Sequence, residues 1–231
     1  MEYAAQPGDV AVARSESNFL QRVFLWMFVG LGVTGGVAAA IGSSDTLLTD
    51  ITESPGIIIA VIVAQLAIVF GLSFAINRIS VGVATFLFLL YSATVGVTFA
   101  FIFELYTTQS IFTAFLITAG MFGALAVWGA VTDIDLSKLG SIAFMALIGL
   151  ILATIVNIFW ANSTLYWITT YAGVAIFAAL TAYDMQKLTQ ISREGISGDE
   201  AGRAAIMGAL ALYLDFINLF LFLLRIFGQQ R

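Results

Sequence analysis

Two aspartates in the last third of the chain occupy positions where a charge is costly. Asp215 lies near the middle of an apolar stretch over residues 204–227, and Asp184 closes the apolar stretch that precedes it. An ionised side chain at the centre of a membrane helix costs about 2.5–3.5 kcal/mol on insertion scales, so its default interpretation is functional. Asp184 and Asp215 are therefore the first candidates for chemistry.

The spacing of these aspartates allows them to act as a pair. They lie 31 positions apart on what we expect to be consecutive antiparallel helices. Two carboxylates within hydrogen-bond reach in a low-dielectric site cannot both be ionised, so they share a proton and titrate in two macroscopic steps. Their oxygens also suit Ca²⁺ better than Zn²⁺ or Cu²⁺. The pair is thus a candidate proton sensor and a candidate Ca²⁺ contact.

Simpler interpretations of the charged residues stay open at this stage. Asp215 could be protonated and hydrogen-bonded to Asn218 or to a neighbouring helix, while Asp184 sits in the interface beside Lys187. The depth of the two aspartates is also uncertain from sequence, since helix ends near residues 190 and 204 would place them about one helical turn apart. Tilt or a longer helix would remove that mismatch.

Two arginines are candidate partners for carboxylates. Arg78 could latch two helices together through a carboxylate, or it could be a positively charged anchor at the cytoplasmic surface. Arg225 lies about one turn inside the end of its apolar stretch, where it could reach the interface or form an ion pair with Glu104.

Composition sets the class of protein that positions these groups. Of 231 residues, 61% are hydrophobic and 10% are charged, which indicates a polytopic membrane protein with the lipid bilayer as its first partner. A net charge of −5 argues against nucleic-acid binding. The absence of Cys and His removes thiolate chemistry and the usual ligands of transition metals, and we expect no cofactor.

Seven stretches are long and apolar enough to span a bilayer, which predicts an all-α seven-transmembrane bundle. They cover residues 23–41, 56–76, 81–103, 111–131, 139–158, 165–182 and 204–227. Residues 1–18 are polar and are predicted to form a flexible cytoplasmic tail, followed by one transmembrane domain over residues 19–231. Seven of the nine basic residues fall on one side of this topology, which predicts a cytoplasmic N-terminus and an outside C-terminus.

Two segments resemble the C-terminal signatures of the Bax inhibitor-1 family, and most closely those of its bacterial members. They are LTAYDMQKL at residues 180–188 and LYLDFINLFLFLLRIFG at residues 212–228. The resemblance implies a seventh helix surrounded by the other six and a pH-controlled calcium leak across the bacterial inner or plasma membrane. It also implies that Asp184 and Asp215 sense protons, and by position that Arg78 latches the closed state.

The sequence therefore favours a pH-sensitive calcium or cation leak channel and leaves other functions open. A regulatory membrane protein that binds other proteins and moves no ion is one alternative, and a solute exporter is another. Intramembrane aspartyl proteolysis is remote, because Leu212-Tyr213-Leu214 precedes Asp215 in place of a glycine-containing motif. The only prolines, Pro7 and Pro55, lie far upstream, so we expect no enzyme.

Overall fold

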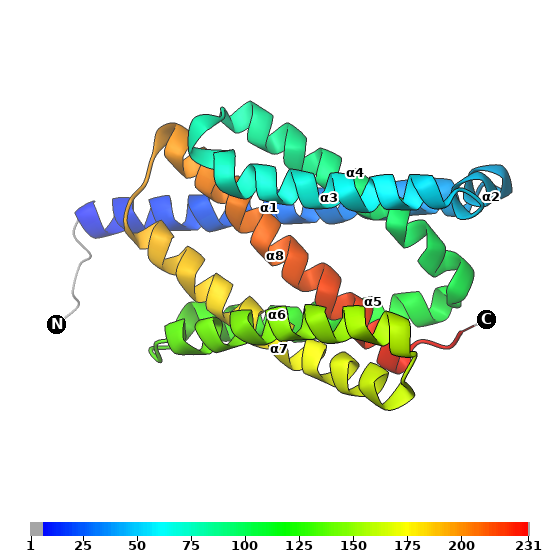
Figure 1. Cartoon of the computed structure of the whole chain (residues 1–231). Helices are drawn as coiled ribbons and strands as arrows, with labels where there is room; N and C mark the ends of the chain where they lie inside the picture. The colour runs from blue at the N-terminus through cyan, green and yellow to red at the C-terminus, as the bar shows by residue number, and fades with distance from the viewer. Residues whose placement is uncertain (1–6, 231) are drawn as a thin grey trace. The chain divides into compact units, whose positions relative to one another are not determined.

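The computed structural model describes residues 7–230, and its regular elements in that range are helices (Figure 1). They are α1 (Pro7–Gly42), α2 (Asp45–Thr52), α3 (Pro55–Ala75), the 3₁₀ turn η1 (Ile76–Arg78), α4 (Val81–Leu105), α5 (Thr108–Val131), α6 (Ser137–Trp160), α7 (Ser163–Arg193) and α8 (Gly198–Phe227). Within this range, seven helices are long and apolar enough to cross a membrane. The predicted all-α seven-span fold is confirmed.

Several helices are longer than the apolar stretches that predicted them. α1 begins at Pro7, so residues 7–18 of the segment predicted as a flexible tail are part of this helix, while residues 1–6 lie outside the described range. Proline suits a helix start because the first turn needs no N–H donor there. α7 continues to Arg193 and ends before Gly195, whose φ of 71° suits a left-handed helix cap. A hydropathy criterion detects only the part of a helix that is apolar.

The packing contacts divide the chain into two compact units. The first unit contains the chain up to Leu105 together with Leu188–Leu210, and the second contains Tyr106–Lys187 and Ala211–Arg231. The sequence predicted one domain from residue 19 onward. One boundary lies between α4 and α5, and the other two fall inside α7 and α8, where no linker or change of composition marks them.

In the first unit, α1 and α3 both pack against α4. α1 and α4 approach closely at Gly96, where a Cβ atom would lie 2.8 Å from the Thr34 carbonyl oxygen. The Thr34 hydroxyl donates to the Ser92 carbonyl oxygen at 2.8 Å. The contact therefore combines a small residue with a hydroxyl bonded to backbone, as is common between membrane helices.

In the second unit, α7 packs against α5 and α6, and α8 packs against α5 and α7. The Phe222 ring of α8 stacks on the Phe177 ring of α7 with centroids 6.0 Å apart. In α8, 72% of the apolar window is buried, against 44% in α7, the next most buried span. Among the spans of the described residues, α8 is therefore the most buried.

Candidate functional site

Asp184 on α7 and Asp215 on α8 belong to the same unit, the second. Asp215 is 4% exposed and Asp184 is half-buried, and their carboxyl groups interact electrostatically. α7 ends three residues beyond Gln190 and α8 begins six residues before Ala204, so both helices extend past the ends that the sequence had placed. The structure thus brings the two predicted carboxylates into one neighbourhood.

The surroundings of Asp215 leave one of its oxygens unsatisfied. Among the described residues, Oδ2 of Asp215 is buried and has no hydrogen-bond partner. The Asn218 side-chain amide donates to the Leu214 carbonyl oxygen at 2.8 Å, one turn earlier on the same helix. A helix interior offers no free backbone donor either, because each N–H is bonded within the helix. This oxygen is therefore available to a proton, a water molecule or a cation.

The adjacent residue fixes the α8 turn that carries Asp215. The Phe216 ring meets the rings of Phe115 and Phe122 on α5 edge to face, with centroids 5.6 and 5.5 Å apart. Such aromatic pairs contribute about 0.5–1.5 kcal/mol beyond the area that they bury. α5 therefore holds the Asp215 turn of α8.

The α7 turn that carries Asp184 packs against α5 and α6 through two glycines. The Ala182 backbone carbonyl lies where a Cβ atom on Gly129 of α5 would be. The Tyr183 ring covers Gly140 of α6, where an added Cβ would come within 2.7 Å of three ring carbons. Neither contact tolerates a larger residue without movement of α7.

Gln186 is a site residue that the sequence interpretation missed. It is 8% exposed, and its Oε1 accepts from the Leu136 N–H at 2.9 Å. Its Nε2 donates to the Ile134 carbonyl oxygen at 2.8 Å and to the Thr132 carbonyl oxygen at 3.5 Å. Its polar neighbours along the sequence suggest a solvated helix end, and only its place two residues after Asp184 singles it out.

The two predicted contacts of arginines with carboxylates both stay predictions. Arg78 ends η1, is exposed and belongs to the first unit, so its latch with Asp184 stays a prediction. The guanidinium carbon of Arg225 lies 5.5 Å from the Tyr166 ring centroid and 5.2 Å from that of Phe222. Glu104 is exposed in the last turn of α4 and not in a loop. An ion pair of Glu104 with Arg225 also stays a prediction, and Arg225 has aromatic contacts with Tyr166 and Phe222.

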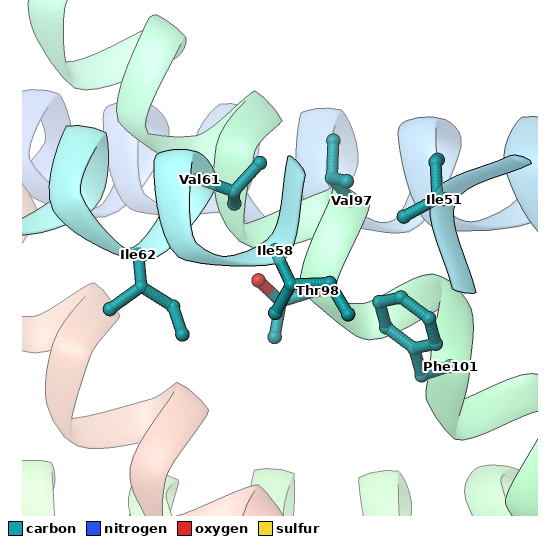
Figure 2. Close-up of a pocket in the computed structure, with 7 residues that line it drawn as sticks. All are labelled: Ile51, Ile58, Val61, Ile62, Val97, Thr98 and Phe101. Atoms are coloured by element: carbon teal, nitrogen blue, oxygen red, sulfur yellow. The ribbon is translucent and has the colours of Figure 1, made fainter. Parts of the chain in front are cut away.

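The pocket in Figure 2 has no carboxylate in its lining and differs in chemistry from the site of Asp184 and Asp215. It has a volume of about 150 Å³ in the first unit and is lined by Ile51, Ile58, Val61, Ile62, Val97, Thr98 and Phe101. The Thr98 hydroxyl, its one polar side-chain group, accepts a 2.9 Å hydrogen bond from Gln65. An apolar lining of this kind offers no acid, base or cation ligand.

The carboxylate pair is too small a donor set for a resident metal. Within residues 7–230, no cluster of three or more Asp, Glu, His or Cys side chains could hold a metal ion. Two carboxylates supply at most four oxygens, whereas Ca²⁺ takes 6–8. Backbone carbonyls or water would have to complete the shell, which suits a passing cation better than a bound one.

The seven apolar helices define an integral membrane protein, and comparison with known sequences gives its family. The family model described as inhibitor of apoptosis-promoting Bax1 matches residues 16–231. The chain therefore belongs to the Bax inhibitor-1 family.

Three bacterial proteins illustrate the similarity. Inner membrane protein YbhL of Escherichia coli strain K12 is 46% identical over 216 residues, which cover 93% of this chain and 92% of that protein. An uncharacterized protein of Deinococcus radiodurans is 43% identical and one of Borreliella burgdorferi 42%, with 93% and 94% of this chain and 91% and 94% of those proteins covered. These relationships support an integral protein of the bacterial inner membrane.

Proposed function

We propose that this protein is a pH-sensitive leak for Ca²⁺ or similar cations, with Asp184 and Asp215 as its proton sensor. The observation that carries the proposal is the buried Oδ2 of Asp215, which has no partner among the described residues and whose carboxyl group interacts with that of Asp184. Hydroxyl and amide groups elsewhere in membrane helices can bond to backbone carbonyls. A carboxylate can do so only when it is protonated.

Proton exchange at this pair changes the charge that a cation meets. When both carboxyl groups are ionised, their mutual repulsion favours entry of a cation or separation of the helices. When the pair holds a proton, that repulsion falls and the closed packing of α7 against α8 becomes favourable. A pKa difference of one unit between the open and closed states corresponds to about 1.4 kcal/mol, or a tenfold change in their relative populations. Such a change is enough to gate a slow leak.

The proposal assigns further roles to the charged residues. Arg78 stabilises the closed state by pairing with Asp184, which stays ionised while Asp215 holds the shared proton. The N-terminus is cytoplasmic and the C-terminus outside, because basic residues are concentrated on the side of the N-terminus. Protons act as the regulator, and Ca²⁺ is the transported ion that Asp184 and Asp215 contact in passing. Arg225 anchors the outer end of α8.

Ca²⁺ flux into liposomes that contain only the purified protein tests this function. Flux is measured from about pH 5 to about pH 8 for the wild type, Asp184→Asn and Asp215→Asn, where one carboxylate alone can no longer share a proton. Asp50→Asn removes an exposed carboxylate of α2 and is the matched control. We expect a protein-dependent flux whose pH profile flattens in the two site variants and not in the control.

The opposite results separate the other functions. If the folded protein gives no flux above that of empty liposomes at any pH, the leak function is rejected, and a partner-dependent role or solute export is favoured. A flux with an unchanged pH profile in both site variants would keep the leak but remove the sensor. Cleavage of a membrane-embedded peptide that is lost in both variants would establish proteolysis instead.

A further inference from the structure

The hairpin of α5 and α6 contacts both turns that carry the carboxylates. On α7, Ala182 touches Gly129 of α5 and Tyr183 covers Gly140 of α6. On α8, Phe216 is held by two rings of α5. The separation of Asp184 from Asp215 therefore depends on how each turn is seated on this one hairpin.

The connection between α5 and α6, residues 132–136, is joined to α7 by polar contacts. Gln186 accepts one backbone hydrogen bond from this connection and donates two to it. One N–H and two carbonyls are thereby satisfied by a single side chain in a buried position. Leu136 is itself 3% exposed, so its N–H has no ready replacement partner in water.

We propose that Gln186 is a positioning residue, which fixes the Asp184 turn of α7 on the α5–α6 connection and so sets the interaction of Asp184 with Asp215. The side-chain amide of Gln186 is hydrogen-bonded through both its oxygen and its nitrogen: the oxygen accepts from an N–H and the nitrogen donates to carbonyls. This pattern fixes the rotation of α7 about its axis. A purely apolar contact would let the turn slide, because dispersion contacts are not directional. The role rests on the proposed proton sensor.

Other charged groups of the second unit also act on this pair and must be held constant in a test. Within the second unit, the titratable or charged side chains on these elements are Tyr166, Tyr171, Tyr183, Asp184 and Lys187 on α7, Tyr213, Asp215 and Arg225 on α8, Asp133 and Asp135 on the connection, and Lys138 on α6. The sequence of α5 contributes none. Replacing Gln186 by an uncharged residue leaves all of these groups in place.

Gln186→Met tests the role with two readouts that do not need ion flux. Methionine keeps the unbranched shape and removes the hydrogen bonds, and Gln190→Met on the exposed face of the same helix is the matched control. We expect the Leu136 amide to exchange hydrogen about tenfold faster in Gln186→Met, as for the loss of one hydrogen bond of ordinary strength. The infrared band of the protonated carboxyl group is identified by its absence in Asp215→Asn. We expect the pH midpoint of this band to be shifted in Gln186→Met.

A second pair of variants disturbs the same turn without touching Gln186. Gly140→Ala presses on the Tyr183 ring, whereas Gly149→Ala on the same helix meets nothing within 4 Å. The proposal requires Gly140→Ala to shift the carboxyl titration and Gly149→Ala to leave it unchanged. If Gln186→Met does not fold, the comparison of Gly140→Ala with Gly149→Ala tests whether the seating of the Asp184 turn sets the carboxyl titration.

The outcomes for this role and for the leak are distinguishable. An unshifted carboxyl titration in Gln186→Met and in Gly140→Ala would overturn the positioning role, even if the connection exchanges faster. A shifted titration in a protein that gives no flux would uphold the positioning role and reject the leak. Where flux exists, Gln186→Met should alter its pH profile and Gln190→Met should not.

Discussion

Both units of this protein bury hydroxyl groups, and among the described residues the second unit also buries a carboxylate and a side-chain amide. In the first unit, buried hydroxyls bond to nearby carbonyls, as Thr34 does with Ser92 and Ser92 with Phe88. In the second unit, the buried set includes the carboxylate of Asp215 and the amide of Gln186. A hydroxyl can always donate to a helix carbonyl, but an ionised carboxylate can only accept. A buried hydroxyl is thus compatible with simple packing, whereas a buried carboxylate needs a proton or a cation.

The largest expected effect on stability is at the α5–α7 contact of the second unit. In Gly129→Ala the new methyl group would collide with the Ala182 backbone carbonyl, which cannot move without α7. We expect the free energy of unfolding to fall by about 3 kcal/mol, the upper part of the usual range for overpacking. Denaturation with SDS in mixed micelles measures this loss.

The control for that substitution lies on the same helix. Gly123→Ala meets nothing within 4 Å, so we expect stability within about 1 kcal/mol of the wild type. Equal losses in both variants would show that the loss arises from glycine itself and not from the contact with α7.

The next effect tests whether tight packing alone explains the second unit. Gly96→Ala would place a methyl group 2.7 Å from Val37 Cβ and 2.8 Å from the Thr34 carbonyl oxygen in the first unit. We expect about 2 kcal/mol of destabilisation. The pH profile of cation flux should nevertheless keep its wild-type shape, because no buried carboxylate lies at this contact.

Gly71→Ala on α3 meets nothing within 4 Å and is the control for Gly96→Ala. A flattened pH profile in Gly96→Ala, with Gly71→Ala unchanged, would show that the first unit also contributes to proton sensing. The distinction between the units would then fail.

The sequence predicts the seven spans but neither the units nor the hydrogen bonds of Gln186. Long apolar stretches must be helical in a bilayer, so their number and order follow from composition. Two of the unit boundaries fall within α7 and α8, where the amino-acid composition of the helix does not change. Asp184 and Asp215 stand out because charge is costly, whereas Gln186 acquires its role only when residues 132–136 fold against it.

A smaller effect is expected at the α3–α4 contact. Gln65 donates to the Thr94 carbonyl oxygen at 3.0 Å and to the Thr98 hydroxyl at 2.9 Å. Hydrogen bonds between membrane helices contribute about 0.6 kcal/mol on average, so Gln65→Leu should lower the free energy of unfolding by about that amount. A loss several times larger would mean that the first unit also depends on a polar interaction for its packing.

The smallest effect concerns Asp135, outside the spans. Its carboxylate accepts from the Ser137 N–H at 2.9 Å, and hydrogen bonding by Ser137 lowers the pKa of Asp135 below its usual 3.8. The ionised group therefore adds stability above the usual pKa, and this stability is lost as the pH falls through the lowered value. Asp135→Asn should be slightly less stable than the wild type at neutral pH and equally stable in strong acid. A difference that grows in acid would contradict this sign.

The most direct test of the shared proton is a double-mutant cycle on the pH dependence of Ca²⁺ flux. Wild type, Asp184→Asn, Asp215→Asn and the double variant are compared in liposomes, after each is shown to be folded. If the two carboxyl groups act as one unit, either single substitution removes most of the pH response and the double variant loses little more. Independent, additive changes in the two single variants would contradict a shared proton and, with it, the proposed sensor.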